Sequence, residues 1–323
     1  MADGGQRPRP GGGGPTNWGR FGDDDELGTL NFLTPTAVLA AASCIRTGEY
    51  FPLNLPLDQP AGIGFGRPDY QRVQHARNID VLGMTVNDDW VTIALQGSSQ
   101  WDGLIHAGLE EPGHDGVFYN GVGTDAVDES GFVHKNSIDK VAQRGIVGRG
   151  VLLDIARFVA GGADTPLPLT FLIEEDLVRE CSDRQGVAIR QGDVVCLRTG
   201  WTEAYLRATE AGKAELMAPV DDLGHTACPG ISAGLATLAH EQGWAAVTAD
   251  NLGMDATPPR GGWAASAHVT MMRNLGLTFG ELFWYQRLAE ACQRDGRWDF
   301  LFVAVPLWVP GGSGSPSCAI AIR

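Results

Sequence analysis

The sequence predicts a mixed α/β fold. Short runs rich in β-branched residues alternate with segments whose apolar residues are three and four positions apart, which is the pattern of interleaved strands and amphipathic helices. The chain has 323 residues, of which 43% are hydrophobic, so it can bury a large core without needing two domains. Composition and periodicity indicate an α/β domain of enzyme size, and they specify nothing more about function.

The N-terminal segment MADGGQRPRPGGGGPT consists almost entirely of glycine, proline and polar residues. Such a segment cannot offset the entropy that it loses on ordering. We therefore expect residues 1–16 to be a disordered tail and residues 17–323 to form one folded domain that begins near Trp18.

Three segments have the features of helices. Thr34 and Pro35 before TAVLAAASCIRTG supply an N-cap, a proline at the first helical position and a glycine stop. Residues 231–243 (ISAGLATLAHEQG) and 276–296 (GLTFGELFWYQRLAEACQRDG) have apolar positions at helical spacing. We expect an amphipathic helix in each of these two segments.

Short β-branched runs bounded by Gly, Asp or Pro predict the strands. They are residues 91–95, 150–156, 193–199, 245–250 and 300–307. Residues 108–150 contain many glycines and aspartates and have weak periodicity, so a long loop region is expected there.

The charge and the cysteines narrow the class of protein. The formal net charge is −15 and the pI is about 4.8, which disfavours nucleic acids and anionic membranes because both require a basic face. No apolar run is long enough to span a bilayer or to act as a secretory signal. The six cysteines contain no C-x-x-C pair and are typical of small buried residues. We expect a cytoplasmic protein that acts on a small molecule.

Reactive side chains are concentrated in residues 96–106 (QGSSQWDGLIH), where an acid and an imidazole lie four positions apart. His106 is a candidate acid/base because an imidazole titrates near physiological pH; the alternative is a half-buried histidine that satisfies a backbone group. Asp102 is a candidate to orient His106 or to act as a base itself. The alternative is an aspartate that only caps the turn before Gly103. Trp101 is the aromatic residue expected to contact substrate, although such residues are more often core.

This stretch resembles the signature H-x-G-T-H-x-D-x-P-x-H of the metal-dependent cyclase and hydrolase family, which includes bacterial kynurenine formamidase and isatin hydrolase. Asp102 and His106 match the pattern, while Gln96 and Gln100 replace its two earlier histidines. Further family landmarks follow in family order: WGRFGDDDELGTLNFLTP, GVLLDIAR, RTGW, CPGIS, TADN and HVTMMRNLGLTFGE. The resemblance implies one domain with the swivelling β/β/α fold, active as a homo-oligomer, dimer or tetramer.

The resemblance also implies metal ligands. The family's first metal position corresponds to Gln96, Gln100 and Asp102, and two of these three are now carboxamides. Its second position corresponds to Asp102, His268 and Glu281, a chemically intact set of three that suits one Zn²⁺ or Mn²⁺. Two metals are not expected; one metal and none both remain open. The alternative to metal binding is that Gln96 and Gln100 donate and accept hydrogen bonds at strand ends or at a substrate carbonyl.

Three functions follow as hypotheses. The first is a hydrolase or cyclase acting on a cyclic or acylated small molecule at a C–N or C–O bond, with an amide, lactam or lactone type carbonyl, His106 as acid/base and one metal. The second is a metal-free acid/base cyclase or dehydratase of natural-product, polyketide-like biosynthesis, in which Gln96 or Gln100 hydrogen-bonds the oxyanion. The third is a catalytically inactive relative that binds a ligand. No residue pattern surrounds Ser98 or Ser99 as in a serine hydrolase.

Overall fold

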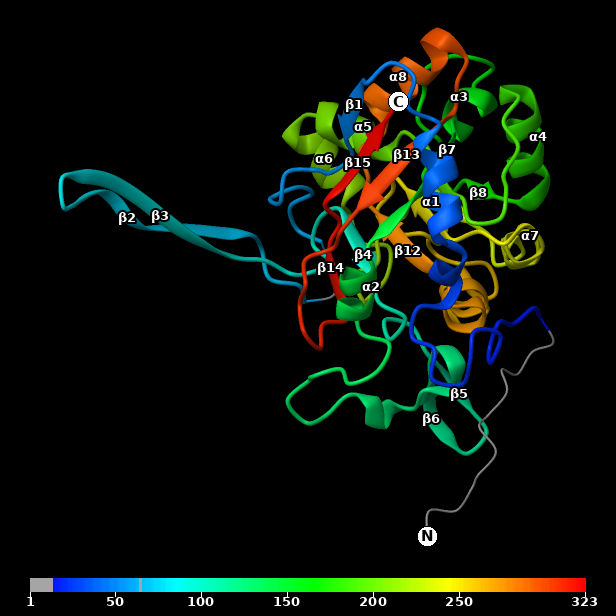
Figure 1. Ribbon diagram of the computed structural model, residues 1–323, viewed down its shortest axis with the longest axis horizontal. Helices are drawn as coiled ribbons and strands as arrows, with labels where there is room; N and C mark the ends of the chain where they lie inside the picture. The colour runs from blue at the N-terminus through cyan, green and yellow to red at the C-terminus, as the bar shows by residue number, and fades with distance from the viewer. Residues whose placement is uncertain (1–13, 64–65) are drawn as a thin grey trace.

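A curled sheet of nine strands lies at the centre of the computed structural model, which describes residues 14–63 and 66–323 (Figure 1). The strand order is β1-β15-β13-β7-β9-β11-β12-β4-β14. The strands are β1 (Tyr50–Pro52), β4 (Gln100–Asp102), β7 (Ile146–Leu153), β9 (Val194–Leu197), β11 (Ala246–Ala249), β12 (Thr278–Glu281), β13 (Asp299–Ala304), β14 (Gly314–Pro316) and β15 (Ala319–Ile322).

The centre of the sheet is parallel and its two sides are antiparallel. Strands β7, β9, β11 and β12 pair in parallel, and the remaining pairs are antiparallel. A parallel strand is covered on both faces and therefore reads as a continuous apolar run. VVCL of β9 and AVTA of β11 are such runs, and every residue in them is buried. The predicted mixed α/β fold is confirmed, and both strands lie within their predicted segments.

The helices are short and follow or precede the strands. They are α1 (Pro35–Ala42), α2 (Ile138–Arg144), α3 (Ile155–Val159), α4 (Glu175–Gln185), α5 (Trp201–Arg207), α6 (Glu210–Leu216), α7 (Leu235–Gln242) and α8 (Gln286–Asp295). α1 begins as predicted, since the Thr34 side chain accepts a hydrogen bond from the Ala37 amide, but it ends at Ala42, before the predicted glycine stop. α1 lies against β7 and β13.

Shorter elements complete the chain. Within the part of the chain that the structure describes, four 3₁₀ turns are η1 (Gly28–Phe32), η2 (Tyr119–Gly121), η3 (Thr124–Ala126) and η4 (Trp263–Ala265), and η5 (His268–Arg273) is a π-helix. Two small sheets pair β8 (Leu172–Ile173) with β10 (Gly230–Ile231) and β5 (Leu109–Glu111) with β6 (His114–Val117). Residues 108–150 therefore contain strands, turns and α2 as well as loop.

Two predicted elements are wrong in part. Residues 276–296 do not form one helix, because β12 precedes α8. The apolar residues of β12 are buried by its pairing with β11 and β4, so burial outweighs their helical spacing. The predicted strand over residues 91–95 is only the end of a longer strand, β3 (Met84–Thr92).

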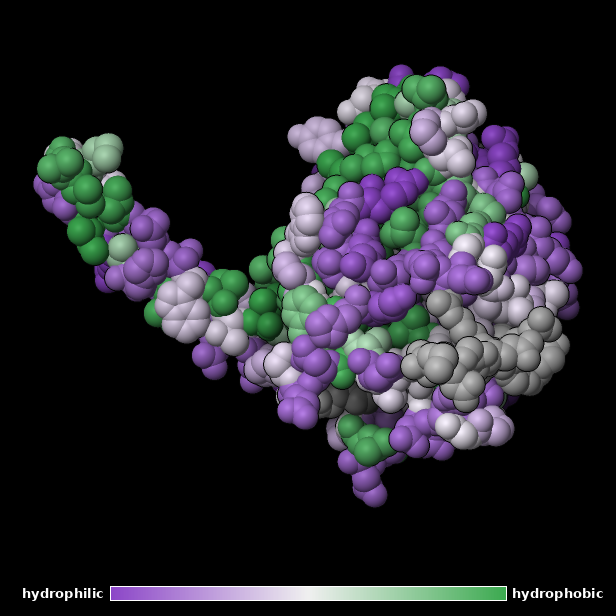
Figure 2. All heavy atoms as spheres, turned by 60° about the horizontal axis from the view of Figure 1, so that its bottom comes forward, coloured by the Kyte–Doolittle hydropathy of each residue, from purple (hydrophilic) through white to green (hydrophobic). Residues whose placement is uncertain are grey.

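That strand belongs to an arm that extends far from the body (Figure 1). β2 (Gln71–Val81) pairs with β3 as an antiparallel hairpin with two register shifts. Most of its side chains are exposed, and apolar ones gather at its tip, including fully exposed Leu82 and largely exposed Met84 (Figure 2). The arm was not predicted because its polar composition resembles that of a loop.

The start of the described chain is attached to the body. Thr16 Oγ1 donates to the Asn274 carbonyl at 3.0 Å, and the side-chain amide of Asn17 donates to the Leu275 carbonyl at 2.9 Å. Residues 1–13 of the predicted tail lie outside the described residues. The six cysteines are free thiols, and five of them are buried. None of the described helices combines the length and apolar character needed to cross a membrane.

Candidate functional site

Two neighbouring strands place carboxylates and an amide on one side of the sheet. β4 and β12 are antiparallel, with Gln100 directly opposite Glu281. Side chains of directly opposed residues meet on the same face, and Gln100 Nε2 donates to Glu281 Oε2 at 2.6 Å. Asp102 lies two positions after Gln100 and therefore projects to the same side of the strand. All three side chains are buried.

Trp101, between Gln100 and Asp102, projects to the opposite side. Its indole is fully buried among Phe283 and Phe302, and its Nε1 donates to the Ser317 carbonyl at 3.2 Å. A Cβ on Gly280, opposite Trp101, would lie 3.0 Å from the ring, so the glycine makes room for it. The expectation that Trp101 contacts substrate is therefore corrected: strand alternation places it in the core.

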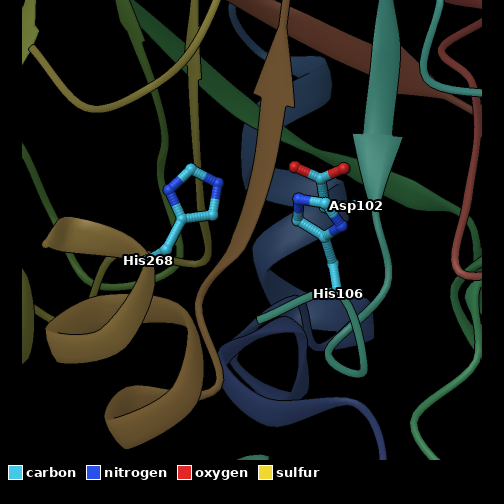
Figure 3. A group of neighbouring side chains, drawn as sticks. All are labelled: Asp102, His106 and His268. Carbon is cyan, nitrogen blue, oxygen red and sulfur yellow. The ribbon is translucent and has the colours of Figure 1, made fainter. Parts of the chain in front are cut away.

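Gln96 connects the two reactive residues of the motif. Its Nε2 lies 2.5 Å from Asp102 Oδ1 and 2.9 Å from His106 Nδ1. His106 follows β4 in a tight turn, in which its amide donates to the Gly103 carbonyl at 2.9 Å. The turn folds the imidazole back beneath the carboxylate, and both are close to His268 (Figure 3).

His268 opens the π-helix η5 and is held by Asp255. Its Nδ1 lies 2.5 Å from Asp255 Oδ2, while Asp255 Oδ1 accepts the Ala267 amide at 2.6 Å. The adjacent Met254 amide donates to Glu281 Oε1 at 2.6 Å. The other ring nitrogen of His268, Nε2, lies 3.8 Å from Glu281 Oε1. Residues 254–255 thus position both a histidine and a carboxylate, a role that the sequence analysis missed.

His106, His268 and Glu281 line a cavity of about 410 Å³. Three further residues of the cavity wall were not predicted. His225 stacks on Trp263 with ring centroids 4.5 Å apart, and its Nδ1 lies 2.5 Å from Asp221 Oδ2. The Arg67 guanidinium donates to the main-chain carbonyl of Gln96 at 2.9 Å. The rest of the wall is mainly apolar or small: Ala107, Gly108, Thr226, Cys228, Leu252, Gly253, Thr257, Ser266 and Val269.

Burial and mutual charge change the pKa values of the site. Burial, followed by the nearby His268, lowers the pKa of His106 to about 3, so its imidazole is neutral at physiological pH. Burial alone would lower the pKa of His268, but the hydrogen bond to Asp255 and the charges of Asp255, Glu281 and Asp102 raise it to about 9. Burial raises the pKa values of Asp102 and Glu281.

The residues of the site fit one divalent metal ion. One ligand atom from each of Asp102, His106 and His268 lies within 4.8 Å of the others. Asp102 Oδ2 and Gln100 Oε1 are buried and find no hydrogen-bond partner among the residues that the structure describes. A buried carboxylate oxygen without a partner is costly, and a cation would satisfy it. The Asp255–His268 pair is the arrangement that orients metal-binding histidines.

The comparisons with known proteins identify the family. The model of the family described as "Putative cyclase" matches residues 52–256. A crystal structure described as that of a novel cyclase is 32% identical, covers 96% of this chain and 100% of its own, and has a TM-score of 0.84. This chain therefore belongs to the cyclase family and has its α/β fold. No curated protein matches it.

More distant structures share the fold. Isatin hydrolase A from Labrenzia aggregata, bound to benzyl benzoate, is 17% identical, with a TM-score of 0.61 over 91% of this chain and 98% of that one. Isatin hydrolase A from Ralstonia solanacearum is 21% identical, with a TM-score of 0.60 over 90% and 98%. The family match and the 32% identical structure confirm the resemblance to the cyclase and hydrolase family that the sequence indicates.

Proposed function

We propose that this protein is a hydrolase or cyclase that acts on a cyclic or acylated small molecule at a carbonyl bonded to nitrogen or oxygen. One observation carries the proposal: His106, His268 and Glu281 line a mainly apolar cavity of about 410 Å³, and a carboxylate oxygen of Asp102 lies within 4.8 Å of a nitrogen of each histidine. Such cavities with a few converging polar groups are typical of small-molecule sites. Membership of the cyclase family and the fold shared with isatin hydrolases support the same class of reaction.

Asp102, His268 and Glu281 would hold one Zn²⁺ or Mn²⁺ ion. Asp102 Oδ2, which has no hydrogen-bond partner within residues 14–63 and 66–323, and the His268 Nε2 beside Glu281 supply the oxygen and nitrogen donors that these ions prefer. When bound, the ion would polarise the carbonyl and lower the pKa of a water molecule. Gln96 and Gln100 direct their amide nitrogens at Asp102 and Glu281, so their role here is to hold ligands.

His106 is the residue that we assign to exchange hydrogen bonds or protons with the reacting groups of the substrate. It lines the cavity, and its ring centroid lies 5.6 Å from that of His268. Its imidazole is neutral because burial lowers its pKa to about 3, so one ring nitrogen carries a proton and the other a lone pair. Which nitrogen carries the proton decides what the residue does in the reaction.

A panel of small amides, esters, lactones and lactams tests the proposal. We expect wild-type protein loaded with Zn²⁺ or Mn²⁺ to hydrolyse or close at least one of them, and His106→Ala to lose at least 10²-fold in kcat, the usual contribution of a positioned proton donor or acceptor. His114→Ala is the matched control, because His114 is exposed on β6. Wild-type rates in a folded His106→Ala variant would contradict the proposal.

Elemental analysis separates this proposal from its metal-free alternative, an acid/base cyclase or dehydratase. The observation that favours the alternative is that the Gln96 and Gln100 amides already donate to Asp102 and Glu281, as neutral partners that need no ion. About one Zn or Mn per chain, lost in both Asp102→Ala and His268→Ala, supports the metal-assisted reaction. Turnover by protein that retains no metal after loading and dialysis supports the alternative.

A further inference from the structure

Gln96 donates both hydrogens of one amide group to the two residues of the motif. Its Nε2 lies 2.5 Å from Asp102 Oδ1 and 2.9 Å from His106 Nδ1. A carboxamide nitrogen has two N–H donors and accepts no hydrogen bond. Each of the two neighbours must therefore present a lone pair: Asp102 its carboxylate oxygen, and His106 the unprotonated Nδ1.

The opposite orientation of the amide is disfavoured by the same geometry. It would place Gln96 Oε1 at 2.5 Å from Asp102 Oδ1, and two acceptor oxygens at that distance repel unless the carboxyl is protonated. The observed orientation satisfies Asp102 Oδ1 and leaves Asp102 Oδ2 without a hydrogen-bond partner among the described residues. Gln96 thus makes the two oxygens of Asp102 unequal: Oδ1 accepts a hydrogen bond from Gln96, and Oδ2 can bind another group.

The backbone is shaped to hold Gln96 in place. Gly314 on β14 is paired with Asp102 on β4, and a Cβ at Gly314 would lie 2.5 Å from Gln96 Cγ. The aliphatic part of Gln96 therefore occupies the space that a side chain at position 314 would fill. Arg67 adds a second support, because its guanidinium donates to the main-chain carbonyl of Gln96 at 2.9 Å.

We propose that Gln96 is a positioning residue that fixes His106 as the tautomer protonated on Nε2, so that His106 acts as a neutral hydrogen-bond donor to the oxygen of the substrate carbonyl. This inference rests on the proposed function for its substrate and deepens it. A ring nitrogen that carries a proton has no lone pair for a metal. His106 is thereby excluded from the group of possible ligand atoms that it forms with Asp102 and His268, and Asp102, His268 and Glu281 remain for that role.

The chemical consequence is a division of labour within the site. An imidazole protonated at Nε2 stabilises the negative charge that develops on a carbonyl oxygen. It does not remove a proton from water, because its remaining lone pair, on Nδ1, is taken by Gln96. Protonation of Nδ1 would set an N–H against the Gln96 amide N–H, so the arrangement also disfavours the doubly protonated imidazolium.

Nitrogen-15 NMR of the full-length protein, labelled at its histidines, tests the tautomer without any substrate. The His106 signals are assigned by their loss in His106→Ala, and spectra are recorded with metal removed and with Zn²⁺ added. In wild-type protein we expect Nε2 to carry the proton and Nδ1 to be unprotonated. A proton on Nδ1 would overturn the proposal, even if the protein hydrolyses amides or esters.

Gln96→Glu tests the role of the glutamine itself. Once ionised, the carboxylate of Gln96→Glu is nearly isosteric but has acceptors only, so at a pH where it is ionised we expect the His106 proton to move to Nδ1 and kcat to fall at least 10-fold. Gln293→Glu, on the exposed side of α8, is the matched control and leaves the His106 signals unchanged. If Gln96→Glu does not fold, Gln96→Met removes both donors, and the two tautomers are then expected together. An unchanged Nε2 proton in a folded variant would refute the assignment.

The two proposals fail in distinguishable ways. If no compound of the panel is turned over while the NMR spectra show the expected tautomer and its change in Gln96→Glu, the proposed reaction is wrong and the positioning by Gln96 stands. If turnover is found and the tautomer is the other one, the positioning role is wrong and the reaction class stands.

Discussion

Asp255 illustrates how a single residue organises the site from outside the cavity. Its two oxygens accept the Ala267 amide and contact the His268 imidazole and amide at 2.6, 2.5 and 3.2 Å. The carboxylate fixes the orientation of the ring and leaves Nε2 directed toward Glu281. A carboxylate behind a metal-binding histidine also raises the basicity of the ligand.

Replacement of this carboxylate should therefore weaken metal binding. We expect Asp255→Asn to reduce the affinity for Zn²⁺ by about 10–100-fold, measured by competition with a chromophoric chelator. Asp128→Asn is the matched control, because Asp128 forms a similar pair with His134 at 2.9 Å on the exposed surface. Equal affinity of Asp255→Asn and wild type would show that Asp255 has no role in holding His268 for a metal.

The sequence pointed to part of the site, and the reason lies in the kind of signal that each residue carries. Asp102, His106, His268 and Glu281 match family positions, and the structure brings them together. Asp255 lies in TADNLGMDA, where an aspartate is an ordinary turn residue, and only its contacts reveal its role. The pairing of Gln96 with both Asp102 and His106 depends on a turn geometry that sequence does not specify.

At the scale of elements, the three residues of β4 contribute both to the site and to the hydrophobic core. Gln100 and Asp102 belong to the site, whereas Trp101 packs in the core on the other side of the strand. The strand therefore couples core packing to the position of the site. The alternation of side chains along a strand accounts for this division.

Loss of the Trp101 ring should accordingly reduce stability. We expect Trp101→Ala to lower the free energy of unfolding by about 3–5 kcal/mol, the usual cost of removing a large buried ring, as measured by urea denaturation. Trp308→Ala is the control, because Trp308 is 64% exposed and a surface change costs little. A Trp101→Ala variant with wild-type stability would contradict the placement of the ring in the core.

Other elements show where local patterns mislead. The apolar spacing of residues 276–296 suits a helix, but residues 278–281 become β12 because pairing with β11 and β4 buries them. The helical propensity of a short segment is weaker than such burial. By contrast, the N-cap of α1 and the buried runs of β9 and β11 depend on local chemistry and were predicted correctly.

At the scale of the whole molecule, Arg198 ties distant parts of the chain together. It follows β9 and donates to Asp154, Asp164 and Gln286 at 2.8, 2.5 and 2.6 Å. These partners lie before α3, after α3 and at the start of α8. The Arg198 guanidinium is almost completely buried, so its charge depends on these acceptors.

Removal of this guanidinium takes from buried Asp154 one of its two arginine partners, the other being Arg157 at 3.1 Å. We expect Arg198→Ala to lower the free energy of unfolding by about 3–5 kcal/mol, as when one partner of a buried ion pair is deleted. In Arg179→Ala, which breaks an exposed pair with Glu175, the expected loss is below about 1 kcal/mol. Equal thermal stability of the two variants would contradict the role of Arg198 as an internal link.

The arm of β2 and β3 leaves the body and returns to it at one place, since Gln71 and Thr92 are paired at its base. A chain that exits and re-enters at adjacent points can carry a foreign domain without displacing the strands on either side. The arm is therefore a suitable position for inserting another domain. A fluorescent or affinity domain whose own termini are adjacent could replace residues 72–91. We expect such an insertion to leave β4 and the cavity in place.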